Sequence, residues 1–77
     1  MKTVQISLNS IDKVKSFVNT ITKYDNDFDL VSGRYVIDAK SIMGIFSLDL
    51  SKAIDLNIHD DDNMDDILKT LAPYIVE

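Results

Sequence analysis

Several residue types that usually stabilise or equip small domains are scarce in this chain of 77 residues. It contains no cysteine and no tryptophan, a single proline, two glycines and one histidine, His59. The missing cysteines exclude disulfides, on which many domains of this size rely, and leave few residues to ligate a structural metal. Packing must therefore hold the fold, and a hydrophobic content of 45% supplies enough material for a modest core.

Length and charge narrow the class of protein further. The chain is long enough for one domain, which we place at residues 1–77. Its net charge of −5 argues against direct binding of nucleic acid, whose phosphates an acidic surface repels. We find no run near the roughly 20 apolar residues of a membrane span, and charges interrupt residues 1–15 where a signal peptide would be apolar. We therefore expect a soluble, cytoplasmic domain that binds no membrane.

Hydrophobic periodicity predicts four strands and three helices. Apolar and polar residues alternate in the four segments predicted to be strands, which are Met1–Leu8, Phe28–Leu30, Tyr35–Ala39 and Ala53–His59. Apolar residues recur at three- and four-residue spacing along a first helix, whose predicted core-facing stripe is Ile11, Val14, Phe17, Val18, Ile21 and Tyr24. Further helices are predicted over Ile42–Phe46 and Met64–Leu71.

Capping and turn residues mark the ends of these elements. Asn9 or Ser10 can cap the first helix, and Ser41 the second. Gly33 can adopt a positive φ in a hairpin turn. Pro73 should end or kink the last helix and leave Tyr74–Val76 as a last turn. The order is βαββαβα, of the α+β class. We predict an open-faced β-sandwich in which three helices cover one face of the sheet.

Two segments are more specific than the rest, and they read TKYD at residues 22–25 and KSIMGIFSL at residues 40–48. Both resemble the HPr family, the phosphocarrier proteins of the bacterial sugar phosphotransferase system. The resemblance runs from Lys2 to about Ile58, and more loosely through the last helix. It implies an HPr-like, four-stranded antiparallel sheet in the order 1-4-2-3, because such split βαβ folds insert the fourth strand between the first two.

The family's phosphate-accepting motif, Gly-x-His-Ala-Arg-Pro, is replaced in this chain. The corresponding residues 8–13 read LNSIDK, which places Ser10 at the histidine position and Asp12 at the arginine position. A serine phosphate is a stable ester, whereas a phosphohistidine passes its phosphoryl group on readily. A carboxylate also repels the incoming phosphate that an arginine would bind. The chain is therefore similar to relatives that lack the histidine, keep the serine and regulate catabolite repression.

Ser41 matches the serine that a dedicated ATP-dependent kinase phosphorylates in the low-GC Gram-positive members of the family. Residue type and position alone favour a helix cap, and the resemblance raises a kinase target to equal standing. Both roles are compatible, because a phosphate at a helix start keeps favourable contacts with backbone N–H groups.

The second helix is too short to bury all its apolar residues. We expect Ile45 and Leu48 to be buried, and Met43 and Phe46 to be partly exposed as a docking patch. The resemblance implies protein partners, namely an HPr-type kinase, phosphotransferase-system proteins or transcription regulators. The residues predicted to bind them are Asp12, Lys13, Ile42, Met43 and Phe46.

Other candidate sites are weaker. His59 and the acidic residues that follow it are predicted to form a solvated loop rather than a metal site, at the opposite edge of the sheet from Ser10. The run from Asp25 to Asp29 resembles the opening of an EF-hand loop, but Leu30 and Val36 replace its required Gly and Glu. We expect no catalytic residues, metal or cofactor, since the chain has no phosphate loop and no nucleophile–base pair.

The favoured hypothesis is an HPr-like regulatory protein of the phosphotransferase system or of carbon catabolite control, and not an enzyme. One alternative is a degenerate family member that binds an unrelated protein or a small ligand. A working phosphocarrier with an unusual acceptor is the least favoured alternative. The sequence leaves open whether the protein is a monomer or a weak homodimer.

Overall fold

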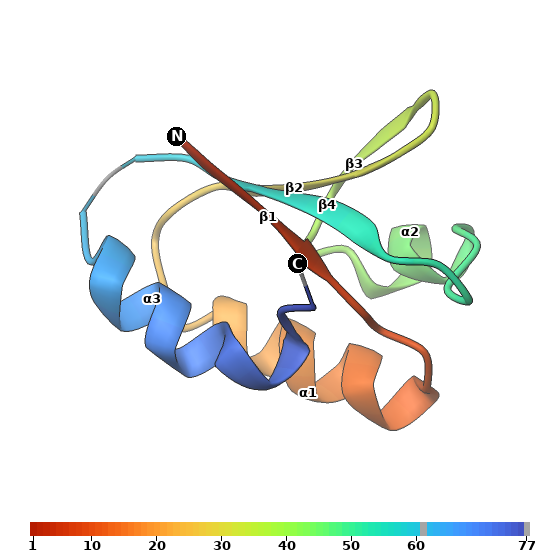
Figure 1. The fold of residues 1–77 in the computed structure, drawn as a ribbon, viewed down its shortest axis with the longest axis horizontal. Helices are drawn as coiled ribbons and strands as arrows, with labels where there is room; N and C mark the ends of the chain where they lie inside the picture. Colours follow the sequence, from red (N-terminus) through yellow and green to blue (C-terminus); the bar gives the residue numbers. More distant parts are fainter. Residues whose placement is uncertain (61, 77) are drawn as a thin grey trace.

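A computed structural model describes residues 1–60 and 62–76 and confirms the predicted element order (Figure 1). The strands are β1 (Lys2–Ile6), β2 (Phe28–Ser32), β3 (Tyr35–Asp38) and β4 (Ile54–Ile58). The helices are α1 (Ile11–Ile21), α2 (Ile42–Phe46) and α3 (Met64–Leu71), and a 3-10 turn follows at Ala72–Tyr74. No helix in these two ranges is long and apolar enough to cross a membrane.

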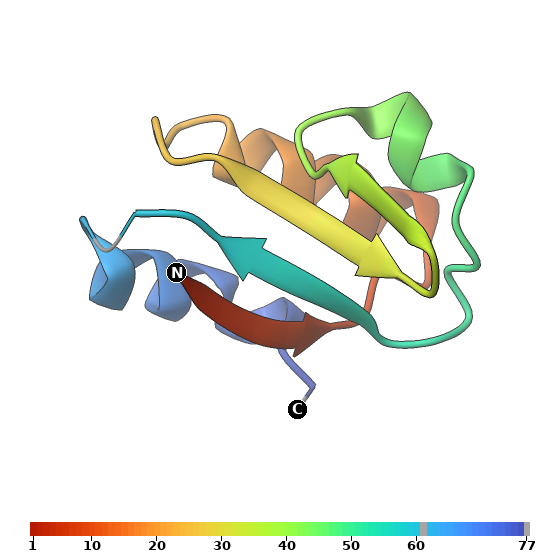
Figure 2. The same cartoon turned by 90° about the horizontal axis from the view of Figure 1, so that it is seen from above.

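The sheet has the predicted order β1-β4-β2-β3, with every neighbouring pair antiparallel. Strand β4 lies between β1 and β2, so that Ile58 is opposite both Lys2 and Phe28. The helices lie on one side of the sheet, and the other side is open (Figures 1 and 2). The prediction of an open-faced sandwich is therefore confirmed.

The core fills the space between the sheet and the helices. Alternate strand residues point into it, including Ile6, Leu30 and Leu56, each of which is fully buried. The helices contribute the rest of a single buried cluster, including Val14, Phe17 and Ile21 from α1 and Ile67 and Leu71 from α3. Phe17 meets Tyr74 edge to face, with 5.6 Å between the ring centroids, and this contact joins α1 to the chain after α3.

Several predicted boundaries are wrong by a few residues. Strand β1 ends at Ile6 and not at Leu8, because its pairing with β4 ends at the Ile6–Ile54 pair. Helix α1 ends at Ile21, and Tyr24 lies half-buried in the following turn.

The end of the chain also differs from the prediction. The last turn spans Ala72–Tyr74 and contains Pro73, whereas we predicted Tyr74–Val76. Ile75 instead forms a bridge to Ile6 and so extends the sheet beyond β1.

The predicted burial of Ile11 is wrong, because 62% of this residue is exposed. Ile11 is the first residue of α1, and helical side chains lean toward the helix N-terminus. Its side chain therefore extends past the end of the helix, where no earlier turn provides a packing partner.

Local capping follows the sequence. The Ser10 Oγ accepts the N–H of Lys13 at 3.1 Å, and the Ser41 Oγ accepts that of Gly44 at 3.3 Å. Gly33 has a φ of +60° in the turn between β2 and β3, as predicted. Asp61, part of the acidic run predicted to lead into α3, lies outside the described residues.

Replacing Phe17 by alanine tests the core. Phe17 is fully buried, so Phe17→Ala should lower the free energy of unfolding by about 3–5 kcal/mol in urea denaturation. The control is Met43→Ala, which should change it by less than about 0.5 kcal/mol because Met43 is 78% exposed. Equal losses in the two variants would show that the core is placed wrongly.

Candidate functional site

The start of α1 and the whole of α2 lie at the same end of the molecule in both views (Figures 1 and 2). The two helices contact each other beneath the sheet. We call residues Ser10–Lys13 and Ser41–Phe46 the candidate surface, because they hold every site residue predicted from the sequence.

Ser10 begins α1 as an exposed cap with an extended backbone, φ −147°. Its side-chain oxygen is occupied by the N–H of Lys13, which stabilises the first helical turn. Asp12 and Lys13 are both exposed in that turn. Ser10 therefore has a structural role of its own, and the two charged side chains border it.

Helix α2 divides its apolar residues between the core and the solvent. Ile45 is fully buried and Leu48 is 9% exposed, whereas Met43 is 78% and Phe46 41% exposed. Ile42 is half-buried and packs against the core. The predicted burial pattern is confirmed, and it leaves two large apolar side chains in solvent beside Ser41.

Gly44 allows the close packing of α2. A Cβ atom at this position would lie 3.3 Å from both the Ile37 Cδ1 and the Ser41 Oγ. Both distances are tighter than ordinary van der Waals contact. A glycine therefore lets α2 approach β3 while the Ser41 cap stays in place.

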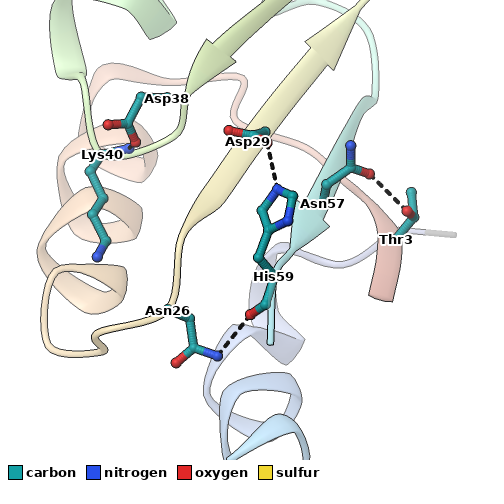
Figure 3. Close-up of polar contacts among 7 residues, drawn as sticks. All are labelled: Thr3, Asn26, Asp29, Asp38, Lys40, Asn57 and His59. Atoms are coloured by element: carbon teal, nitrogen blue, oxygen red, sulfur yellow. Dashed lines mark hydrogen bonds and ion pairs between the residues drawn. The ribbon is translucent and has the colours of Figure 1, made fainter. Parts of the chain in front are cut away.

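The residues that lead into α2 are fixed by Lys40. Its ammonium group donates to the Tyr24 carbonyl at 2.8 Å and lies 5.6 Å from the centroid of the Phe28 ring. Its backbone N–H donates to the Asp38 carboxylate at 2.9 Å, and these two residues are adjacent in Figure 3. The charge of Lys40 is thus engaged by the Tyr24 carbonyl and the Phe28 ring.

The residues that follow α2 are fixed by short polar contacts. The Ser47 hydroxyl donates to the Gly44 carbonyl at 2.6 Å. The Asp49 carboxylate accepts the hydroxyl of Ser51 at 2.6 Å and its N–H at 3.1 Å. These hydrogen bonds, with a smaller contribution from the charge of Lys52, lower the pKa of Asp49 below its ordinary value. Both ends of α2 are therefore held locally.

Ile11 is a candidate site residue that the sequence analysis missed. It is exposed and lies between Ser10 and Asp12, so it adds an apolar side chain to the candidate surface. Its position as the first residue after the cap was the one indication available in the sequence, because a residue there has no preceding turn to cover it.

His59 lies away from the candidate surface. It directly follows β4, whose last residue, Ile58, is opposite Lys2 at the start of β1. Ser10 follows the other end of β1. His59 is therefore at the opposite end of the sheet from Ser10, but not at an edge as predicted, since β4 is an inner strand.

His59 also makes a side-chain contact that the sequence analysis did not predict. Its Nε2 lies 2.6 Å from the Asp29 carboxylate, and its side chain is 38% exposed (Figure 3). A polar row continues from there across the open face, where Thr3, Asn57, Asp29 and Asp38 are successive cross-strand neighbours. No group of three or more potential metal ligands occurs in the described ranges.

Asn26 joins two loops near His59, a role that the sequence did not reveal. It is 5% exposed, and its amide donates to the carbonyls of His59 at 3.0 Å and Asp62 at 3.3 Å. The His59 N–H in turn donates to the Asp27 carbonyl at 2.9 Å. The segment that resembled an EF-hand opening is thus a hydrogen-bonded junction between the chain before β2 and the chain after β4.

Replacing the buried Asn26 by alanine should lower the free energy of unfolding by about 1–3 kcal/mol, because the part-buried carbonyls of His59 and Asp62 lose their donor. Asn19→Ala is the matched control, since Asn19 is exposed on α1 and its side chain makes no hydrogen bond within residues 1–60 and 62–76. Urea denaturation of both variants measures the difference. Equal stability of the two would contradict this role for the Asn26 amide.

Comparison with models of protein families gives no match, and comparison with curated proteins gives none either. Solved structures do match. The crystal structure of HPr-C-His from Thermoanaerobacter tengcongensis has 30% sequence identity and a TM-score of 0.77, over 95% of this chain and 89% of that one. Phosphocarrier protein HPr from Bacillus anthracis str. Ames has 27% identity and a TM-score of 0.71, over 97% and 94%. The similarity thus extends over nearly the whole fold.

Proposed function

The chain belongs to the HPr family, and from this membership we propose that it is a regulatory protein of the sugar phosphotransferase system or of carbon catabolite control. It acts in the cytoplasm by docking on other proteins and catalyses no reaction. Its partners are an HPr-type kinase, phosphotransferase-system proteins or transcription regulators. The observation that carries the proposal is an exposed serine, Ser41, beside two exposed apolar side chains, Met43 and Phe46.

The candidate surface has the composition of a small docking site. Exposed apolar side chains with polar neighbours mark interaction sites on small proteins. Met43 and Phe46 supply the apolar part from α2, and Ile11 adds to it from α1. Asp12 and Lys13 supply exposed charges of both signs, which orient a partner and select for it. Ile42 is half-buried, so it supports this surface more than it contributes contact area.

Phosphorylation of Ser41 is the switch in this proposal. A phosphate adds about −1.5 to −2 charge units at neutral pH. The ammonium group of the adjacent Lys40 already binds the Tyr24 carbonyl. The added charge is therefore not neutralised by Lys40 and acts on partners outside the fold. Partners that bury Met43 are then repelled, and partners that present arginine or lysine are recruited. The same surface thereby exchanges one set of partners for another.

In this proposal the protein lacks the carrier function of the family. Ser10 and Asp12 stand where the resemblance places the phosphate-accepting histidine and the arginine beside it. His59, the single histidine, lies at the opposite end of the sheet from Ser10 and is bonded to Asp29. It is therefore in the wrong place to receive a phosphoryl group from a partner bound at the candidate surface.

Phosphorylation of Ser41 is tested with an HPr-type kinase and labelled ATP. Wild type and Ser47→Ala should both incorporate close to one phosphate, whereas Ser41→Ala should incorporate none. Ser47 is the matched control because it is also exposed and lies just beyond the other end of α2. If wild type stays unlabelled while a genuine HPr is labelled in parallel, Ser41 is only a helix cap. The alternative of a degenerate fold that binds an unrelated protein or a small ligand would then be favoured.

The loss of the carrier function has a separate test. The chain is incubated with labelled phosphoenolpyruvate and the first enzyme of the phosphotransferase system, and acid-labile phosphate is measured. We expect none on the wild type, because Asp12 repels the phosphate and Ser10 forms a stable ester at best. A genuine HPr serves as the positive control. Stoichiometric acid-labile label that disappears in His59→Ala would contradict this part of the proposal.

A further inference from the structure

The two edges of the sheet are treated differently by the fold. At the β1 edge, the chain after α3 forms hydrogen bonds with the strand: Ser7 donates to Tyr74 at 2.8 Å, and Val76 donates to Gln5 at 2.9 Å. Ile75 also bridges to Ile6. Among residues 1–60 and 62–76, no strand pairs with the outer side of β3, which lies at the margin of the sheet in Figure 2. An uncovered edge is a template for pairing with another strand.

The register identifies the backbone groups that β3 directs outward. The N–H of Ala39 donates to the Phe28 carbonyl in β2 at 2.9 Å, so residue 39 faces inward. Hydrogen-bonding direction alternates along an antiparallel strand, which places the backbone groups of Val36 and Asp38 on the outer edge. The Asp38 carbonyl already accepts the N–H of Ser41 at 3.0 Å, in agreement with this orientation. The backbone of Val36 is therefore at the centre of the open edge.

The charged side chains on the two sides of Val36 have opposite signs. Arg34 lies two residues before it, and Asp38 two residues after it. Both are exposed. The Asp38 carboxylate accepts the Lys40 N–H through Oδ1 at 2.9 Å, and the Arg34 side chain has no hydrogen-bond or ion-pair partner within residues 1–60 and 62–76. Val36 is 65% exposed and Tyr35 69%, although both belong to a strand. Charged side chains usually hinder pairing at a sheet edge, but the two charges that flank Val36 have opposite signs and can pair with those of a second, reversed copy.

We propose that β3 pairs with β3 of a second copy of this chain, in an antiparallel arrangement centred on Val36. In that register Val36 faces Val36 of the partner, and Arg34 of each copy faces Asp38 of the other. The two cross-strand ion pairs are related by the two-fold axis, so both form or neither does. A second copy is favoured over an unrelated strand. When two copies of β3 run in opposite directions, the positive charge on one side of Val36 faces the negative charge of the other copy.

The association is weak. β3 has only four residues, and two copies that each carry a net charge of −5 repel each other overall. A contact of this size is below that of a stable interface, so the dimer forms only at high protein concentration. The pairing joins the two sheets through β3, whereas Met43 and Phe46 belong to α2. The inference therefore stands apart from the proposed docking function.

The experiment uses the whole chain with ¹⁵N labelling and follows its amide signals from micromolar to millimolar concentration. We expect the signals of residues 34–38 to shift with concentration, and the sedimentation-average mass to rise in parallel. Signals that are independent of concentration up to the millimolar range would overturn the proposal. A dimer whose shifting signals lie elsewhere, for example in β1, would overturn it as well.

Charge reversal tests the register. Arg34→Asp and Asp38→Arg should each weaken self-association by about tenfold, because two attractive pairs become repulsive. An equimolar mixture of the two variants should associate at least as well as wild type, since opposite charges again face each other. Lys52→Asp is the control, as it changes the net charge as Arg34→Asp does but lies in the exposed segment before β4. Failure of the mixture to associate, or an equal loss in Lys52→Asp, would show that Arg34 and Asp38 do not face each other.

Discussion

The pairing of β4 with both β1 and β2 is the interaction on which the rest of the structure depends. It makes the last strand an inner one, so that Ile54, Leu56 and Ile58 all point into the core and are almost fully buried. It also places Ser10 and His59 at opposite ends of the sheet. The end of β1 leads to Ser10 and α1, whereas the end of β4 leads to His59 and the loops joined by Asn26. That arrangement leaves exposed apolar residues on the helices and a polar row on the open face of the sheet.

Helix α2 depends on local polar contacts more than on its own length. Five residues form too short a helix to be stable alone. Ile45 fastens it to the core, and the hydrogen bonds of Ser41, Lys40 and Ser47 hold its two ends. Met43 and Phe46 are therefore presented on a fixed support. A docking site that is already ordered loses less conformational entropy when a partner binds.

The sequence predicted the features that depend on local patterns. Alternation located the strands, the resemblance supplied the sheet order, and the shortness of α2 predicted that Met43 and Phe46 would be exposed. It failed where contacts join distant segments. The bond between His59 and Asp29 arises because β2 and β4 are neighbours, and no periodicity within either segment encodes it. The amide of Asn26 likewise acts across 33 positions of the chain. Ile11 fits the helical spacing and was misassigned because spacing does not show where the covering elements end.

The central claim is that partners dock on Ser10–Lys13 and Ser41–Phe46 rather than on the open face of the sheet. The most direct measurement is a titration of the ¹⁵N-labelled chain with an unlabelled HPr-type kinase that has no ATP bound, followed through the amide signals. The account predicts that signals of Ser41, Met43, Phe46 and the first turn of α1 shift or broaden, while those of Thr3, Asn57 and His59 stay in place. Changes confined to Thr3, Asn57 and His59 would contradict it.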